Sequence, residues 1–434
     1  MKDRLRANFA AVLRELDPTP AVRTALQSRH AELVTVRDVL VLALGKAARP
    51  MATAAAAELR AIAPKATVRG LVVVPEPDDR ALPPFEVLAG GHPLPTAGSF
   101  AAARRALQLC HEASSQTFVL FLISGGASSL CELPLDDSIS LASWREFYRA
   151  LVGSGAGIEA INTVRKFVSA TKGGKLAAAA HRAHSQWTLA IGDVPGDDLS
   201  ALGSGPSLGC DTTLAEFREV LLRHDLLQTV PLPLRARAAI ADLPPLLQRD
   251  APCMAHSRAF SLLDNDVAVA AAQLQALGNG FRTVVVRDAD ELQSHEAAAH
   301  LLAVLRDEVA HAAGPVAVIA GGEVRVALPA QVGTGGRNQH FALQCAIAIA
   351  EEPITVLSCG TDGIDGNSTA AGALVDGTTI ARARARGLDV DAALRTFDAF
   401  PLLHALGDTV ITGPTGTNVR DVRILVHSGA AAKA

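Results

Sequence analysis

The stretch VLVLALGKAARPM, residues 39–51, combines an apolar run, a Gly-Lys turn and the start of a helical pattern. The run is apolar at every position and does not alternate, which is typical of a strand covered on both faces, as in a parallel sheet. A helix that begins directly after such a strand presents backbone N–H groups at the strand's carboxyl end. The stretch therefore predicts a βα unit with a ligand-binding turn at Gly45 and Lys46.

Similar apolar runs recur between alanine-rich helical patterns along the whole chain. They lie at residues 70–74, 118–124, 187–194, 282–288, 315–324, 354–363 and 423–427. This rhythm predicts an α/β fold, and a Leu- and Pro-rich zone at 230–252 is a natural boundary. We expect two domains: a larger Rossmann-like, doubly wound parallel sheet over residues 1–250, and a smaller α/β domain over residues 251–434.

Composition excludes several classes of function. The 434 residues carry a net charge of −4 and only 4% aromatic side chains, so a nucleic-acid partner is not expected. No apolar run approaches the length of about 18 residues that a membrane span needs, and the first 16 residues have the pattern of an amphipathic helix, not a signal peptide. The six cysteines are scattered singly, as buried thiols are in a reducing cytoplasm. We expect a cytoplasmic protein without a membrane partner.

The lysines are few and unevenly placed. Only seven of the 40 basic residues are lysines, and four of these lie in or beside glycine-bearing turns: Lys46, Lys166, Lys172 and Lys175. A compact ammonium group suits a site beside a phosphate, so Lys46 is the main candidate. The alternative is a solvated lysine at a helix start.

Two further turns of the first half are candidates for anion binding. The basic segment 161–180 contributes Asn162, Arg165, Lys172, Gly173 and Gly174, and the turn after the strand 118–124 contributes Ser124, Gly125, Gly126 and Ser128. Adjacent glycines let the backbone approach a ligand, and hydroxyl and N–H groups bind its oxygens. A basic outer helix face and a tight strand-to-helix turn are the corresponding structural alternatives. The turn after the strand 118–124 has neither a Walker pattern nor a G-x-G-x-x-G pattern.

Carboxylates follow the strand 187–194. Asp193 is positioned to accept a substrate hydroxyl proton or to hold magnesium, and it is the one candidate metal ligand. Asp197 is a candidate binding residue, although it and Asp198 could merely cap the next helix.

The second half contains a glycine-rich helix start, GTGGRNQ, at residues 333–339. It predicts an anion site, because helix amides and Arg337 both attract phosphate or a small carboxylate. Binding candidates in this half are Glu323, Gly335, Gly336, Asn338, Gln339, Asp362, Asp365, Thr415 and Asn418. Turn chemistry alone is the alternative for the Asp-Gly segments.

Several segments together resemble the bacterial and archaeal glycerate 2-kinase family, which joins an amino-terminal glycerate kinase domain to a carboxy-terminal MOFRL domain. They occur in the family's order between about residues 5 and 427: ALGKAA, GHPLPTAGS, SGGASSL, NTVRKFVSATKGGKLA, GDVPGDDLSALGSGP, GGEV, GTGGRNQ, GTDGIDGNSTAAGA and TGPTGTNV. The MOFRL region corresponds to about 315–427. The chain departs from the family at Ala127 and Ser129, and at Phe167, where histidine is frequent.

The resemblance implies an enzyme that transfers phosphate from ATP, with Mg²⁺ or another divalent cation, to the 2-hydroxyl of D-glycerate. It implies a site in the cleft between the two domains, with Lys46, Arg337 and Asp193 as catalytic residues. We hypothesise that Lys46 and Arg337 reach the γ-phosphate from opposite walls of this cleft.

Two other functions stay open at this point. Some members of the family are labelled hydroxypyruvate reductases, which implies an NAD(P)H-dependent reductase of hydroxypyruvate or tartronate semialdehyde; the absent dinucleotide fingerprint argues against it. A non-catalytic sensor of a phosphorylated sugar acid is the other. The sequence is compatible with a homodimer and does not fix the oligomeric state.

Overall fold

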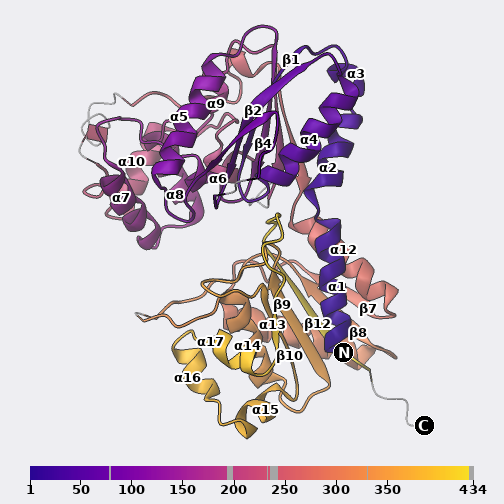
Figure 1. Ribbon diagram of the computed structural model, residues 1–434. Helices are drawn as coiled ribbons and strands as arrows, with labels where there is room; N and C mark the ends of the chain where they lie inside the picture. Colours follow the sequence, from indigo (N-terminus) through magenta and orange to yellow (C-terminus); the bar gives the residue numbers. More distant parts are fainter. Residues whose placement is uncertain (78–79, 193–198, 232, 235–242, 330, 430–434) are drawn as a thin grey trace. The chain divides into compact units, whose positions relative to one another are not determined.

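The computed structural model describes residues 1–77, 80–192, 199–231, 233–234, 243–329 and 331–429. The chain forms two compact units. We call Pro18–Leu263 the central unit, and Met1–Asp17 together with Asp264–Ala434 the terminal unit. Each unit contains one six-stranded sheet covered by helices (Figure 1).

The sheet of the central unit is entirely parallel, with strand order β3-β2-β1-β4-β5-β6. Its strands are β1 Asp38–Leu44, β2 Thr67–Val74, β3 Phe85–Ala89, β4 Thr117–Ser124, β5 Ser185–Ile191 and β6 Ser257–Leu263. The chain builds outward from β1 in one direction and then returns to place β4 on its other side. Leu44 pairs in register with Ile123, so β1 and β4 end side by side. This is the topological switch point at which doubly wound sheets bind their ligands.

Helices cover both faces of this sheet. Among its described residues, the α-helices are α2 Pro18–Gln27, α3 His30–Leu33, α4 Ala48–Ile62, α5 Ala97–His111, α6 Ala127–Leu130, α7 Leu141–Gly153, α8 Ile158–Val168, α9 Lys175–Ala179 and α10 Leu214–Arg223, and the 3₁₀ helices are η2 Leu199–Ser204 and η3 Pro252–Met254. Leu40, Leu42 and Leu44 belong to one buried cluster with residues of α5 and α7. The continuous apolar runs of β1 and β4 follow from this double cover, since both faces of each strand are buried.

The terminal unit has a mixed sheet, with strand order β11-β10-β9-β12-β8-β7. Of the strand pairs in the described part of this unit, β7 and β8 are parallel and the others are antiparallel. Its strands are β7 Arg282–Val286, β8 Val316–Ala320, β9 Ile354–Gly360, β10 Gly372–Asp376, β11 Thr409–Val410 and β12 Asp421–His427. Its helices are α1 Lys2–Glu15, α12 Asn265–Gly278, α13 Ser294–His311, α14 Arg337–Ala348, α15 Thr379–Ala385, α16 Val390–Arg395 and α17 Ala399–Ala405.

The two units differ from the predicted division into residues 1–250 and 251–434. Helix α1 packs against α12 and β10 of the terminal unit, with Leu5, Phe9 and Val12 fully buried. Strand β6 completes the sheet of the central unit, beyond the predicted boundary. The chain therefore passes between the units twice, after Asp17 and after Leu263.

Candidate active site

Lys46 lies at the switch point of the central sheet, in a turn that two neighbouring strands hold together. Its backbone N–H donates to the Gly125 carbonyl oxygen at 2.9 Å, and the Ala47 N–H donates to the Ser124 hydroxyl at 2.9 Å. Gly45 has φ +124°, and a Cβ there would lie 2.2 Å from Ser124 Oγ. The turns after β1 and β4 are thus fixed to each other, and the Lys46 side chain is half-buried between them and solvent.

His92 joins this group, although the sequence did not single it out. It lies in the loop between β3 and α5 and is exposed. Gly126 has φ +88°, and a Cβ at that position would lie 3.2 Å from His92 Cδ2 and 3.5 Å from Lys46 Cγ. His92 lies in the segment GHPLPTAGS, which carries part of the family resemblance. The strand order is a second signal, because the carboxyl ends of parallel strands meet at one edge of the sheet.

A chain of hydroxyl groups connects two other predicted binding residues. The Ser204 hydroxyl donates to Asn162 Oδ1 at 2.8 Å and lies 3.0 Å from the Ser128 hydroxyl. Asn162 also donates from Nδ2 to the Ala201 carbonyl oxygen at 3.4 Å. Ser204 itself has φ +61°, which is uncommon for a residue other than glycine. Asn162 and Ser128 are therefore brought together, through a residue that the sequence reasoning missed.

The basic segment around Lys172 faces the interior of the unit. The Lys172 ammonium group is buried, donates to the Cys131 carbonyl oxygen at 2.7 Å, and lies 3.9 Å from the Glu132 carboxylate. Burial lowers the pKa of Lys172, while Glu132 opposes this effect. The N–H groups of Gly173 and Gly174 donate to the carbonyl oxygens of Ser204 and Gly205. This arrangement supports the turn that contains Ser204, and we do not retain Lys172 as a ligand-contacting residue.

Arg165 lies beside Tyr148, whose hydroxyl donates to the same Glu132 carboxylate. Its guanidinium carbon is 4.9 Å from the centre of the Tyr148 ring. Asp193 and Asp197 lie outside the described residues.

In the terminal unit, the helix start of α14 has an anionic partner from within the chain. The Asp365 carboxylate accepts from the backbone N–H groups of Asn338 at 3.0 Å and Gln339 at 2.9 Å, and from the Gln339 side chain at 2.9 Å. A Cβ at Gly336 would lie 2.3 Å from this carboxyl group, which explains the glycine. Burial raises the pKa of Asp365 to about 6, although these donors oppose the shift. The amides that the sequence assigned to an external anion thus bind Asp365.

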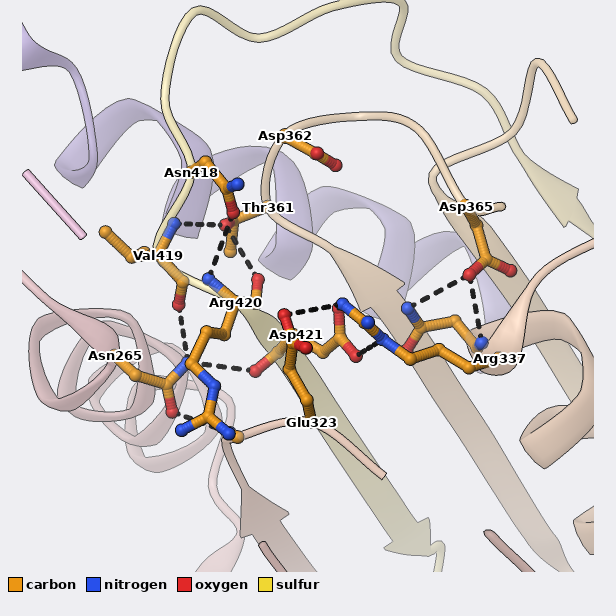
Figure 2. Close-up of polar contacts among 12 residues, drawn as sticks. Asn265, Glu323, Arg337, Thr361, Asp362, Asp365, Asn418, Val419, Arg420 and Asp421 are labelled. Atoms are coloured by element: carbon orange, nitrogen blue, oxygen red, sulfur yellow. Dashed lines mark hydrogen bonds and ion pairs between the residues drawn. The ribbon is translucent and has the colours of Figure 1, made fainter. Parts of the chain in front are cut away.

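Arg337, the first residue of α14, lies between two carboxylates (Figure 2). Its Nε donates to Asp421 Oδ2 at 2.7 Å and its Nη2 to Asp421 Oδ1 at 3.2 Å. Nη2 also lies 2.7 Å from Glu323 Oε1. Burial raises the pKa of Glu323. Burial also acts to raise the pKa of Asp421, but the positive charges of Arg337 and Arg423 outweigh this effect, so the pKa of Asp421 is lowered. Asp421 is therefore the firmly ionised partner of Arg337.

The remaining candidates in this unit are Asp362, Thr415 and Asn418; Figure 2 shows Asp362 and Asn418 in two loops near Asp421. The Thr415 hydroxyl donates to the Thr361 carbonyl oxygen at 2.6 Å, and its N–H donates to the Asp362 carbonyl oxygen at 3.2 Å. Asn418 Oδ1 accepts from the Arg420 N–H at 3.3 Å. The sheet thus gathers Asp362, Thr415 and Asn418 at the edge that carries Arg337. Arg420 was missed by sequence reasoning; it forms a two-point ion pair with Asp290, with distances of 2.8 and 2.7 Å.

Among the described residues, no group of three or more His, Cys, Asp or Glu side chains could hold a metal ion. Within the same ranges, no helix is both long and apolar enough to cross a membrane.

A parallel sheet of this order, with glycine turns and a lysine at its switch point, defines an α/β protein of the doubly wound class, in which ligands bind beyond the carboxyl ends of the strands. Comparison with known families narrows this class. A family model described as a domain of unknown function, DUF4147, matches residues 4–239, and the MOFRL family model matches residues 316–421. The chain belongs to the family that joins these two domains.

Relatives with established names match nearly the whole chain. Glycerate 2-kinase of Pyrococcus horikoshii is 34% identical, with 95% of this chain and 94% of that protein covered. D-glycerate 2-kinase of Thermotoga maritima is 35% identical, with 89% and 90% covered. A relative from Agrobacterium vitis, 35% identical over 97% of this chain and 93% of its own, is named only provisionally, as a hydroxypyruvate reductase.

A crystal structure supports the fold assignment. Glycerate kinase of Thermotoga maritima superposes with a TM-score of 0.82 at 32% identity and covers 98% of this chain and 99% of its own. The predicted α/β fold and the resemblance to the glycerate 2-kinase family are both confirmed.

Proposed function

We propose that this protein is a glycerate 2-kinase, which converts D-glycerate and ATP to 2-phosphoglycerate and ADP. The observation that carries the proposal is the turn at Gly45 and Lys46, held at the switch point of the central sheet by Ser124 and Gly125. The proposal is also supported by the names of two relatives, each matched by this chain over more than nine-tenths of its own length.

The same turn argues against a reductase. The order of the central sheet is that of many dinucleotide-binding proteins, in which the first βα turn carries three glycines for the pyrophosphate. Here that turn contains a single glycine followed by Lys46, Ala47 and Ala48. A lysine at this place suits phosphoryl oxygens, and the missing glycines disfavour a nicotinamide cofactor.

In the proposed reaction, the 2-hydroxyl oxygen of glycerate attacks the γ-phosphorus of ATP, the bond to the β–γ bridging oxygen breaks, and ADP leaves. Lys46 and Arg337 stabilise the negative charge on the transferring phosphoryl oxygens. Asp193, which the sequence identifies as the candidate base, accepts the hydroxyl proton. The serine and glycine amides at 124–128 and Arg165 are the candidates for the glycerate carboxylate.

Mg²⁺ is proposed as the companion of ATP. The described carboxylates nearest to Arg337, Glu323 and Asp421, are engaged with that guanidinium and do not form a ligand set. Asp193 remains the candidate protein ligand from the sequence. Mg²⁺ would neutralise charge on the phosphate groups when it is bound.

The test is an assay of purified protein with glycerate and ATP, with ³¹P NMR to distinguish the 2-phosphate from the 3-phosphate. We expect 2-phosphoglycerate, and a loss of about 10³-fold or more in kcat for Lys46→Ala and for Arg337→Ala. NADH consumption with hydroxypyruvate in the absence of ATP would instead support the reductase. Binding of a phosphorylated acid without turnover would support a sensor. Near-normal rates in both variants would contradict the proposal that Lys46 and Arg337 stabilise the transferring phosphoryl group.

A further inference from the structure

The guanidinium of Arg337 is fixed in one plane by a two-point interaction. Asp421 accepts from Nε at 2.7 Å and from Nη2 at 3.2 Å, while Glu323 lies 2.7 Å from Nη2 on the other side. The two carboxylates come from neighbouring strands of the sheet: Asp421 begins β12, and Glu323 follows β8. Figure 2 shows both beside Arg337. A fork of this kind determines both the position and the orientation of the guanidinium.

Asp421 is itself held rigidly. Its side chain is 1% exposed, and a second arginine, the fully buried Arg423, donates to its Oδ2 at 3.2 Å. Arg423 also donates to the carbonyl oxygens of Gly321 and Gly322, each at 3.2 Å. The Asn265 side chain donates to the Asp421 backbone oxygen at 3.0 Å and accepts from the Gly322 N–H at 2.8 Å. The carboxylate therefore has little freedom to follow Arg337, and Arg337 must conform to it.

The arrangement leaves the Nη1 group of the guanidinium for a ligand. Nε and Nη2 are occupied, and Nη1 makes no hydrogen bond to any residue in the described part of the chain. The Arg337 side chain is 33% exposed, in contrast to Asp421 and Arg423. A buried ion pair is a weak source of stability compared with apolar packing, so orientation is the stronger physical reason for this pair.

We infer that Asp421 is a positioning residue, which holds the Arg337 guanidinium so that Nη1 meets the transferring phosphoryl group. The inference rests on the proposed function, because it assigns Asp421 to the same phosphoryl transfer. Asp421 does not contact the substrates; it acts through Arg337.

The central experiment compares Asp421→Asn with wild type and with a matched control. Asn keeps the size of the side chain but replaces one acceptor oxygen by a donor that faces the guanidinium. Because a misplacement of about 1 Å costs about 10²-fold, we expect kcat to fall by 10- to 100-fold, with the KM for glycerate changed by less than about threefold. Asp408→Asn is the control: Asp408 is 2% exposed and pairs with Arg382 at 2.5 Å and with Lys2 at 2.7 Å in the same unit. It should lower the unfolding temperature and leave kcat unchanged.

A double-mutant cycle tests whether Asp421 acts through Arg337. In an Arg337→Lys background, which retains a cation but lacks the fork, Asp421→Asn should lower kcat by less than about threefold further. A full 10- to 100-fold fall in that background would show that Asp421 acts independently, and it would overturn the inference.

The remaining outcomes are also decisive. Equal kcat in wild type and Asp421→Asn would overturn the inference, whereas a wild type without ATP-dependent phosphorylation would contradict the proposed function instead. Should Asp421→Asn not fold, Asp421→Glu takes its place, because it retains the negative charge for Arg423 and displaces the carboxylate by one methylene. A reduced kcat in folded Asp421→Glu supports the inference, and an unchanged kcat overturns it.

Discussion

Gly45 determines where the Lys46 ammonium group can go. We expect Gly45→Ala to lose at least about 2 kcal/mol of unfolding free energy, because φ +124° is strained for alanine and its Cβ would lie 2.2 Å from Ser124 Oγ. The turn must shift to relieve this contact, so kcat should fall as well. Urea unfolding and the phosphorylation rate measure the two effects.

Gly153→Ala is the control for this substitution. Gly153 ends α7, has no positive φ, and a Cβ there would meet nothing within 4 Å. Its unfolding free energy should be unchanged or slightly higher, since alanine restricts the unfolded chain. An equal loss in both variants would mean that the close approach of Gly45 to Ser124 has no special role.

At this scale, sequence reasoning identified side chains that follow strands but not their internal partners. Lys46 and Arg337 were singled out because glycines and helix starts surround them. Asp421 was not, since it is 84 residues from Arg337 and its neighbours only indicate a strand. Two residues so far apart in the sequence leave no local pattern that shows their pairing. The burial of Lys172 and Glu132 also could not be predicted, because it depends on tertiary packing.

Among the helices and strands, the start of α14 shows most clearly where the sequence predicts a feature but not its partner. The sequence predicted that an anion binds these amides, and the structure supplies one, the Asp365 carboxylate. A pattern of glycines and free amides cannot distinguish an external phosphate from a carboxylate of the same chain. The continuous apolar runs, in contrast, predicted β1 and β4 correctly, because a strand buried on both faces is apolar at nearly every position. Edge strands such as β3 and β6 were missed because they are only partly buried.

Asp365 should therefore matter for stability and for catalysis. We expect Asp365→Ala to cost about 2–4 kcal/mol, because it removes the helix cap and leaves buried N–H donors without an acceptor. Because Arg337 is the first residue of α14, kcat should fall in the same variant. Chemical unfolding and steady-state kinetics measure both quantities.

Asp389→Ala provides the comparison. Asp389 is an exposed cap of the short helix α16 and accepts from the Ala392 N–H at 2.8 Å. Its loss should cost about 1 kcal/mol and leave kcat unchanged. If Asp365→Ala behaved like Asp389→Ala in both assays, α14 would not depend on its internal anion.

At the scale of the whole molecule, helix α1 belongs with residues far from it in sequence. Phe9 is 1% exposed within the terminal unit, so Phe9→Ala should cost about 3–5 kcal/mol. Hydrogen exchange followed by mass spectrometry should show lost protection in α12 and β10, and little change in the central sheet.

Phe217→Ala should give the opposite pattern, because Phe217 is fully buried in the central unit. Loss of protection in the central sheet for both variants would contradict the assignment of α1. The sequence predicted α1 as an amphipathic helix, but an apolar stripe does not indicate which of the two units the helix packs against.

The double passage of the chain between the units has a consequence for synthesis on the ribosome. Residues 1–17 are made before residues 18–263, and their partners in the terminal unit are made only after residue 263. At roughly 5–20 residues per second, this interval lasts on the order of ten to fifty seconds. During that time the apolar stripe of α1 has no native surface to cover, while the central unit is still being made. The nascent chain thus exposes an apolar helix face throughout this interval, and transiently exposed apolar surface is what chaperones protect.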